Sequence, residues 1–197
     1  MNEITFPAAI LQAPFFSIDA DDALNYGGIG YAIGHELTHA FDDHGRKYDE
    51  RGNLCHWWTD EEIETFDART RILVEQYDAY RFLNVSVNGK LTLGENIADL
   101  SGLEVAFEAF SNTEQAKQGV TIDGMTPQQR FFLAVGRAWR AKMTDEKVLF
   151  DLKQDPHAPF AARINGPLSN MLSFYRAFNV SQGDGMYREP KDRAVIW

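Results

Sequence analysis

Cysteine is nearly absent: one residue, Cys55, occurs in 197, which excludes an internal disulfide framework. Its neighbours in NLCHWW form no CxxC or Cys/His ligand spacing, so we interpret Cys55 as a residue without a functional role. Long hydrophobic runs are also missing, because no apolar stretch approaches the ~18 residues that span a membrane. The first residues lack a basic region and contain Pro7 and Pro14, so they do not form a signal peptide.

Basic residues are fewer than acidic ones, with 19 Lys and Arg against 29 Asp and Glu, and the formal net charge is −10. No Lys/Arg run offsets this charge, which argues against a nucleic-acid partner. The rest of the composition, 44% hydrophobic and 24% charged, is typical of a globular protein. The length therefore allows one large domain with its own core.

Helix and turn signals divide the chain into segments. Helices are predicted from Ala23 through the His-rich segment, from Thr59 to about Tyr80, from Glu95 to Phe110, from Thr126-Pro127 through QQRFFLAVGRAWRAKM, and over MLSFYRAF. The first residues, NEITFPAAIL, read as one or two short extended pieces, and VSVNGKLTL reads as a hairpin centred on Asn88-Gly89. We interpret DPHAPFAARINGPLSN as a loop because Pro and Gly interrupt it.

Four glycines, Gly27, Gly28, Gly30 and Gly34, lie in the first predicted helix. Each weakens an isolated helix by about 1 kcal/mol relative to alanine. A helix with this composition is expected to be buried, with the glycines allowing another backbone to come close.

The segment GYAIGHELTHAFDD contains the pattern HExxH, with His35 and His39 four positions apart. On a helix both imidazoles project from one face, about 6 Å apart in rise, which suits two nitrogens binding one Zn²⁺. Glu36 points about 100° away from His35, so it is placed to take a proton from a metal-bound water rather than to ligate. The alternative is a chance match, which only the context of the motif can exclude.

A catalytic zinc site also needs a third protein ligand and an open fourth position. In GKLTLGENIADLSG, Glu95 begins a predicted helix and Asp99 follows on the same face. A carboxylate ligand and a second carboxylate that holds the other N–H of a histidine match this need, and Asp42 could hold His39 in the same way. Without the two histidines, Glu95 and Asp99 would be read as an ordinary acidic helix start.

Three motifs in order, GHELTHAFDDHGR, GENIAD and RINGPLSNM…FYRAF…W, resemble the neprilysin family (M13) of zinc metallopeptidases, whose bacterial members are PepO-type endopeptidases. The resemblance covers residues 1–197. It implies a mostly helical α+β catalytic domain of the thermolysin-like zincin (gluzincin) type, with a small N-terminal β-sheet and the HELTH and GENIAD helices packed together. It also implies one Zn²⁺ per chain, held by His35, His39 and Glu95, with Glu36 as general base and Asp99 and Asp42 as anchors of the ligands.

The same resemblance assigns two residues of the predicted loop. His157 matches the family histidine that stabilises the transition-state oxyanion, and Arg163 matches the arginine that hydrogen-bonds substrate carbonyls. A positioned donor of this kind is worth roughly 2.7–4 kcal/mol. Without the resemblance, His157 would be read as a surface histidine.

The resemblance further implies an S1′ pocket that accepts bulky apolar residues, so peptide bonds on their amino side would be cleaved. Its walls would be Ile10, Phe15, Tyr31, Ala32, Ala138 and Trp139. Each of these residues singly could equally be ordinary core. His44, which stands where relatives commonly have Asn or Gln, is not expected to be a ligand.

Family members are far longer and carry an N-terminal helical domain that caps the catalytic domain. That domain is absent from this sequence, so the resemblance identifies the chain as a C-terminal catalytic fragment. We expect oligopeptide substrates, the missing N-terminal domain as a partner, and poor activity of the fragment alone. PepO-type proteins occur in the cytoplasm and in the envelope, and for a bacterial protein we favour the cell envelope, the periplasm or secretion.

Two alternatives remain open at this stage. A non-catalytic peptide-binding module would not need His35, Glu36, His39 and Glu95 to be intact. A purely structural zinc site would be closed by four protein ligands, often thiolates, and Cys55 is the single cysteine.

Overall fold

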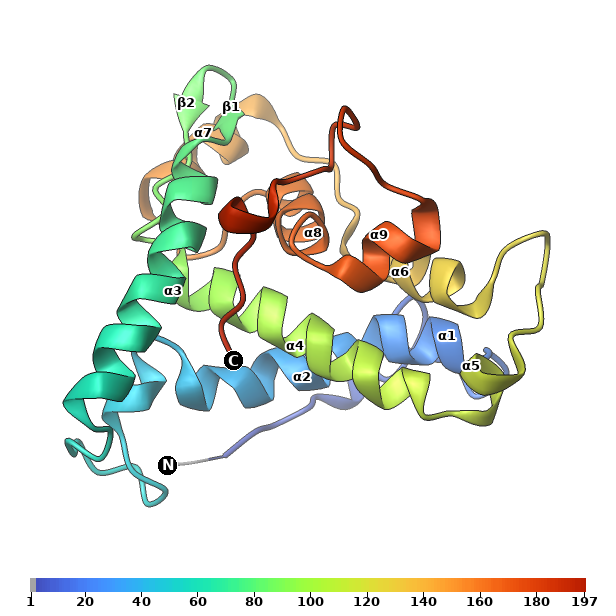
Figure 1. Cartoon of the computed structure of the whole chain (residues 1–197), viewed down its shortest axis with the longest axis horizontal. Helices are drawn as coiled ribbons and strands as arrows, with labels where there is room; N and C mark the ends of the chain where they lie inside the picture. Colours follow the sequence, from blue (N-terminus) through green and yellow to red (C-terminus); the bar gives the residue numbers. More distant parts are fainter. Residues whose placement is uncertain (1–2) are drawn as a thin grey trace.

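The computed structural model describes residues 3–197 and is dominated by helices (Figure 1). The helices are α1 (Asp22–Asn25), α2 (Tyr31–Thr38), α3 (Asp60–Asp78), α4 (Leu93–Ser111), α5 (Glu114–Gln118), α6 (Pro127–Trp139), α7 (Asp145–Gln154), α8 (Phe160–Leu168) and α9 (Leu172–Phe178). Two short strands, β1 (Arg81–Phe82) and β2 (Val85–Ser86), pair antiparallel. The mostly helical fold class is thereby confirmed. Within the described residues, no helix is both long and apolar enough to cross a membrane.

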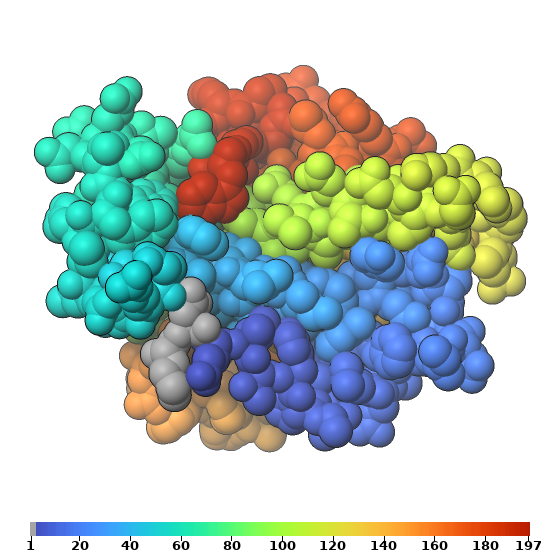
Figure 2. All heavy atoms as spheres, turned by 90° about the horizontal axis from the view of Figure 1, so that it is seen from below, coloured from blue at the N-terminus to red at the C-terminus, as the bar shows by residue number. Residues whose placement is uncertain are grey.

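Helix α4 forms the centre of the molecule, with α2, α3 and α8 packed around it (Figure 1). Its buried side chains include Ile97, Leu100, Leu103 and Phe110, each at most 1% exposed. Because apolar residues lie on several faces of α4, the helix is covered on most sides, as expected of a helix that crosses a core. The predicted pairing of the HELTH and GENIAD helices is confirmed, and Figure 2 shows α2 and α4 side by side.

Local signals place the helix starts where the sequence indicated. Thr59 and Thr126 each form a capping box. The threonine side chain accepts a hydrogen bond from the backbone N–H three residues later, and the side chain of that later residue accepts one from the backbone N–H of the threonine. Asp21 caps α1 by accepting from Leu24 N. Between α1 and α2, Tyr26–Gly30 forms a π-helical turn in which Gly27 and Gly28 are buried.

The small sheet lies between α3 and α4, not at the N-terminus as predicted. Its turn is formed by Leu83 and Asn84, which have φ of 50° and 64°, so the prediction of a hairpin centred on Asn88-Gly89 is wrong. Gly89 packs against α3 instead: a Cβ there would lie 2.3 Å from Val74 O. The glycine signal was thus a close helix contact rather than a turn.

The interpretation of residues 155–170 as a loop is also wrong, because α8 occupies Phe160–Leu168. Pro159 precedes the helix, where a missing N–H costs nothing, and Pro167 lies in its last turn. The prolines therefore bound a short helix rather than prevent one.

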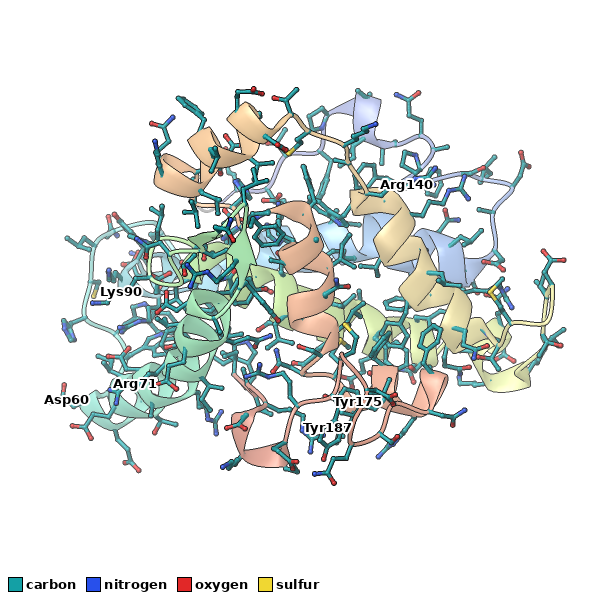
Figure 3. All side chains as sticks on the ribbon, turned by 90° about the horizontal axis from the view of Figure 1, so that it is seen from above. Asp60, Arg71, Lys90, Arg140, Tyr175 and Tyr187 are labelled. Carbon is teal, nitrogen blue, oxygen red and sulfur yellow. The ribbon has the colours of Figure 1, made fainter. Side chains whose placement is uncertain are left out.

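The C-terminal segment closes the fold by lying between α3 and α4 (Figure 2). Arg69 Nη1 donates to Ile196 O at 2.7 Å, and Trp197 Nε1 donates to Ser101 Oγ at 3.0 Å. Upstream of this segment, Tyr175 and Tyr187 lie side by side with ring centroids 5.7 Å apart (Figure 3). The first two contacts hold the last residues against α3 and α4, and α4 carries part of the site described next.

Candidate metal centre

Two helices bring together the three predicted metal ligands. His35 lies in the last turn of α2, His39 begins the 3₁₀ turn His39–Phe41, and Glu95 lies in the first turn of α4. The two Nε2 atoms are 3.1 Å apart. Glu95 places Oε2 3.2 Å from His35 Nε2 and Oε1 3.7 Å from His39 Nε2.

These separations fit one zinc ion. A tetrahedral site with bonds of about 2.0–2.1 Å has edges of roughly 3.3 Å, close to all three distances. Ligand atoms of His35, His39 and Glu95 lie within 4.8 Å of one another, and the group is the sole candidate metal cluster among residues 3–197. Three protein ligands leave the fourth position of a tetrahedron for water or substrate, as a catalytic site requires.

Carboxylates hold the other ring nitrogen of each histidine. His39 Nδ1 lies 2.7 Å from Asp42 Oδ2, and His35 Nδ1 lies 2.9 Å from Asp99 Oδ1, although the latter contact is not aligned as a hydrogen bond. A carboxylate beside Nδ1 favours the tautomer that carries its proton there, which leaves Nε2 with a lone pair. The Nε2 lone pairs of His35 and His39 then face the carboxylate of Glu95, and a cation placed among these three acceptors would bind all of them.

Asp42 is itself fixed by the turn that follows it. Its Oδ1 accepts from the backbone N–H of His44 at 2.8 Å and of Gly45 at 2.6 Å. Burial raises the pKa of Asp42, but the hydrogen bonds from His39, Gly45 and His44 outweigh this and lower it. Asp42 therefore stays ionised and holds the ring of His39 in place.

Asp99 is fully buried on α4, and Arg163 and Tyr31 compensate its charge. Arg163 Nε donates to Oδ2 at 2.9 Å and Arg163 Nη2 donates to Oδ1 at 2.8 Å, while Tyr31 Oη donates to Oδ1 at 2.7 Å. Burial raises the pKa of Asp99, but Arg163 and His35 together outweigh burial and lower it. Burial and the neighbouring Asp99 raise the pKa of Tyr31 well above 10, so its hydroxyl remains a donor.

Without a cation the ligands behave as an acid–base cluster. Burial lowers the pKa of His35, but its contacts with Asp99 and Glu95 outweigh burial and raise the pKa from 6.5 to about 9. Burial raises the pKa of Glu95, and the contacts with His157 and His35 lower it by more. Without a metal, the site therefore favours the protonated form of His35, and metal binding must release that proton.

His157, predicted to face the oxyanion, reaches the metal centre from the segment between α7 and α8. Its Nε2 lies 3.1 Å from Glu95 Oε2, and its side chain is 45% exposed. Asp155 Oδ1 accepts from His157 N at 2.8 Å and lies 2.8 Å from Nδ1. The contact with Glu95 raises the pKa of His157, and the contact with Asp155 adds to the rise. The sequence analysis did not identify Asp155, although its position two residues before His157 in D-P-H could have indicated a local contact with that histidine.

Arg163 lies behind the ligands rather than in open solvent. It is 5% exposed, its Nε and Nη2 are occupied by Asp99, and its guanidinium lies 4.3 Å from the ring centroid of Trp139. The prediction that Arg163 also reaches substrate carbonyls stays a prediction.

The predicted S1′ residues are partly brought together. Phe15 and Tyr31 both pack edge-on against Trp139, at centroid distances of 6.0 and 5.7 Å, and His35 lies 6.5 Å from the same ring. Trp139 Nε1 is buried without a hydrogen-bond partner. Tyr31 and Ala32 are buried at 1% and 6% exposure, while Ile10, Phe15, Ala138 and Trp139 are half-buried. Their role as a substrate pocket stays a prediction.

A cleft of about 910 Å³ opens beside the ligands. Its wall includes Glu36 and His39 from the metal-binding segment, Ile4 and Thr5 from the N-terminal segment, and Trp57. Glu36 is exposed in this cleft, where a proton acceptor can meet a water molecule near His39. Among the described residues that line it, none belongs to the predicted S1′ set.

Comparison with known families gives one match that spans almost the whole chain, "Peptidase family M13", over residues 1–194. Two curated relatives illustrate it. An endothelin-converting enzyme homolog of Locusta migratoria is 45% identical over 199 residues, and a neutral endopeptidase of Lactobacillus helveticus is 42% identical over 196 residues. Both matches cover 100% of this chain, but it spans only 27% and 29% of the two relatives.

Solved structures agree with these relatives. Mycobacterium tuberculosis zinc metalloprotease Zmp1, in complex with an inhibitor, superimposes with a TM-score of 0.94 at 45% identity, over 100% of this chain and 31% of that one. PepO from Lactobacillus rhamnosis superimposes with a TM-score of 0.88 at 42% identity, over 98% of this chain and 29% of that one. At these identities the likeness extends to the sequence as well as to the fold.

Proposed function

This chain belongs to peptidase family M13, and from that premise we propose that it is the catalytic part of a longer zinc endopeptidase that hydrolyses oligopeptides. The observation that carries the proposal is the set of three ligand atoms, His35 Nε2, His39 Nε2 and a carboxylate oxygen of Glu95, at the spacing of one tetrahedral zinc ion. When bound there, zinc would lower the pKa of a water molecule and polarise the scissile carbonyl.

Glu36 is proposed as the general base. It is the residue after the first ligand and is exposed on the wall of the cleft that also contains His39. A carboxylate in this position accepts the proton of the attacking water and then delivers it to the leaving amine. Its exposure in the cleft supports this role over that of a ligand.

His157 is proposed as the donor that stabilises the oxyanion. Its Nδ1 is tied to Asp155, and its Nε2 points at the ligand group, 3.1 Å from Glu95 Oε2. Because these contacts raise the pKa of His157, they favour the protonated imidazole, which can donate a hydrogen bond to a developing negative charge.

Arg163 is proposed to act in two ways. It neutralises the buried Asp99, which in turn lies against His35, and it contributes a fixed positive charge beside the ligands, with Nη2 3.7 Å from Glu95 Oε2. Its contact with substrate carbonyls, and a preference for bulky apolar residues after the cleaved bond, rest on the family resemblance together with the aromatic wall around Trp139.

The isolated chain is proposed to bind zinc but to hydrolyse peptides slowly. It spans 27% of the length of the locust relative, and the parts of the relatives outside the match are proposed to enclose the substrate. An open cleft leaves the reacting groups in water, which weakens electrostatic stabilisation of the transition state. Peptide substrates, and the location of the whole protein in the bacterial envelope or beyond it, remain part of this proposal.

The test measures zinc content and cleavage of a fluorogenic oligopeptide on the same preparations. Three proteins are compared: the wild-type chain, Glu36→Gln, and Glu75→Gln, which removes the charge of an exposed glutamate on α3. The full-length neutral endopeptidase of Lactobacillus helveticus is the reference for rate. We expect one zinc in each chain, slow cleavage by wild type and Glu75→Gln, and a loss of at least about 100-fold in Glu36→Gln.

Three results would contradict separate parts of the proposal. A wild-type chain without zinc would refute the metal centre. Cleavage that persists in Glu36→Gln would refute the assignment of the base and favour another source of activity. A wild-type rate equal to that of the full-length reference would refute the idea that the isolated site is too open.

A further inference from the structure

Tyr31 contacts the metal centre from behind, although the sequence indicated only a wall of the substrate pocket. It is the first residue of α2, one turn before His35, and its side chain is 1% exposed. Its hydroxyl donates to Asp99 Oδ1 at 2.7 Å, across 68 residues of sequence. A buried phenol has one hydrogen to donate, and when it donates to a buried carboxylate it restricts the position of the oxygen that accepts.

The oxygen it contacts is the one that faces the metal ligand. Asp99 Oδ1 lies 2.9 Å from His35 Nδ1, and it also accepts from Arg163 Nη2 at 2.8 Å. The other oxygen, Asp99 Oδ2, accepts from Arg163 Nε at 2.9 Å. The two donors at Oδ1 therefore set the position of the carboxylate oxygen that lies beside His35 Nδ1.

The ring of Tyr31 is held as firmly as its hydroxyl. It packs edge-on against Trp139 at 5.7 Å and edge-on against His35 at 6.4 Å. Tight packing leaves a buried aromatic ring with one rotamer, so the hydroxyl cannot follow the carboxylate if Asp99 moves. Tyr31 thus provides a fixed point for Asp99, and through Asp99 for the imidazole of His35.

We propose that Tyr31 is a positioning residue of the metal centre, whose hydroxyl orients Asp99 so that Oδ1 receives His35 Nδ1–H and His35 Nε2 points at the metal. The inference rests on the proposed role of His35 as a ligand. Partners that orient ligating histidines typically change metal affinity by 10–100-fold when they are lost. Because Tyr31 acts one step further away and Arg163 remains, we expect about tenfold, the lower end of that range.

The experiment compares Tyr31→Phe with Tyr77→Phe in the metal-free chain, by competition for zinc with a chromophoric chelator. Tyr77 is a matched control, because it is 0% exposed and its hydroxyl donates to a backbone carbonyl, Ala162 O, at 3.3 Å. Both variants lose one buried hydroxyl bond, so both should lose some stability. Only Tyr31→Phe should bind zinc about tenfold more weakly.

A spectrum gives a second readout that a purely structural role would not change. The visible bands of Co²⁺ in the site depend on the geometry of its ligands, so they should shift in Tyr31→Phe and remain at the wild-type position in Tyr77→Phe. Tyr31→Met, which also lacks the hydroxyl but has a flexible side chain, repeats the test if Tyr31→Phe does not fold.

The outcomes separate this inference from the proposed function. Weaker zinc binding and shifted bands in Tyr31→Phe alone would support the positioning role. Wild-type zinc affinity and an unshifted spectrum in a folded variant without the hydroxyl would overturn it. A wild-type chain that binds no zinc would overturn the metal centre and, with it, the role of Tyr31. Neither readout depends on peptide cleavage, so an inactive but zinc-binding chain still tests Tyr31.

Discussion

A single methyl group at Gly102 should disturb the metal centre more than its size suggests. Gly102 lies where α4 crosses α2, and a Cβ there would lie 2.3 Å from His35 N and 2.6 Å from Gly34 C. The reciprocal Cβ on Gly34 would lie 2.4 Å from Gly102 O. All of these are backbone atoms, on α2 and α4, so no side chain can rotate away to make room.

The magnitude follows from the geometry. In Gly102→Ala the helices must separate by roughly 1 Å before the new contact reaches an attractive distance. Overpacking of this kind lowers the free energy of unfolding by about 1–3 kcal/mol, and the better helix propensity of alanine raises it by up to about 1 kcal/mol. We therefore expect a net loss of about 1–2 kcal/mol in the free energy of unfolding of the metal-free chain.

Zinc binding should report the same strain. A zinc site tolerates about 0.2 Å of change in its ligand distances, so a shift of roughly 1 Å between α2 and α4 leaves Glu95 too far from the histidines. If zinc must restore the original spacing, about 1–2 kcal/mol is lost from binding as well, which corresponds to about tenfold weaker affinity.

The assays are urea unfolding of the metal-free protein and chelator competition for zinc. Gly136→Ala in α6 is the matched control, because a Cβ there meets nothing within 4 Å. It should gain up to about 1 kcal/mol of stability and bind zinc as wild type does. If Gly102→Ala matched Gly136→Ala in both assays, the argument that glycine sets the helix spacing would be refuted.

Three further predictions concern charged residues. Burial raises the pKa of Glu104 from 4.5 to about 7, so its contribution to stability is present below pH 4.5 and is lost as pH rises through 7. Glu104→Gln should therefore raise the thermal midpoint at pH 8 and change it little at pH 4.5, whereas an equal effect at both would contradict the assignment. Arg163→Leu leaves Asp99 buried without its main partner and should cost about 3–5 kcal/mol in urea unfolding of the metal-free chain; a loss below 1 kcal/mol would be inconsistent with a buried ion pair. Asp42→Asn should weaken zinc binding by about 10–100-fold in chelator competition without unfolding the chain, because His39 loses the carboxylate that orients its ring.

Local chemistry made some parts of the fold predictable. Thr59 and Thr126 carry their own capping signals within three residues, and both helices begin where these signals lie. The prolines and glycines were less informative, because the same residue serves a turn, a helix start or a close contact. Gly89 and Pro159 were read as turn and loop signals, and the structure uses one for packing and the other to begin α8.

The candidate site shows the same division. The spacing of His35 and His39 is local to α2 and the turn that directly follows it, so the sequence by itself predicted that their imidazoles share a face. That Glu95 lies on a second helix at the right distance depends on how α4 crosses α2 at Gly34 and Gly102, which no local pattern encodes. The contacts of Asp155 with His157 were within reach of local reasoning, because the two residues are neighbours in D-P-H.

What the sequence determined, then, is the chemistry: which side chains are available as ligands, base and anchors, and which helix face presents them. What only the tertiary structure decided is the arrangement behind those side chains. The hydroxyl of Tyr31 reaches Asp99 across 68 residues, and Arg163 reaches the same carboxylate across 64. Such contacts arise from packing between helices far apart in the chain, whereas periodicity and capping act over only a few residues.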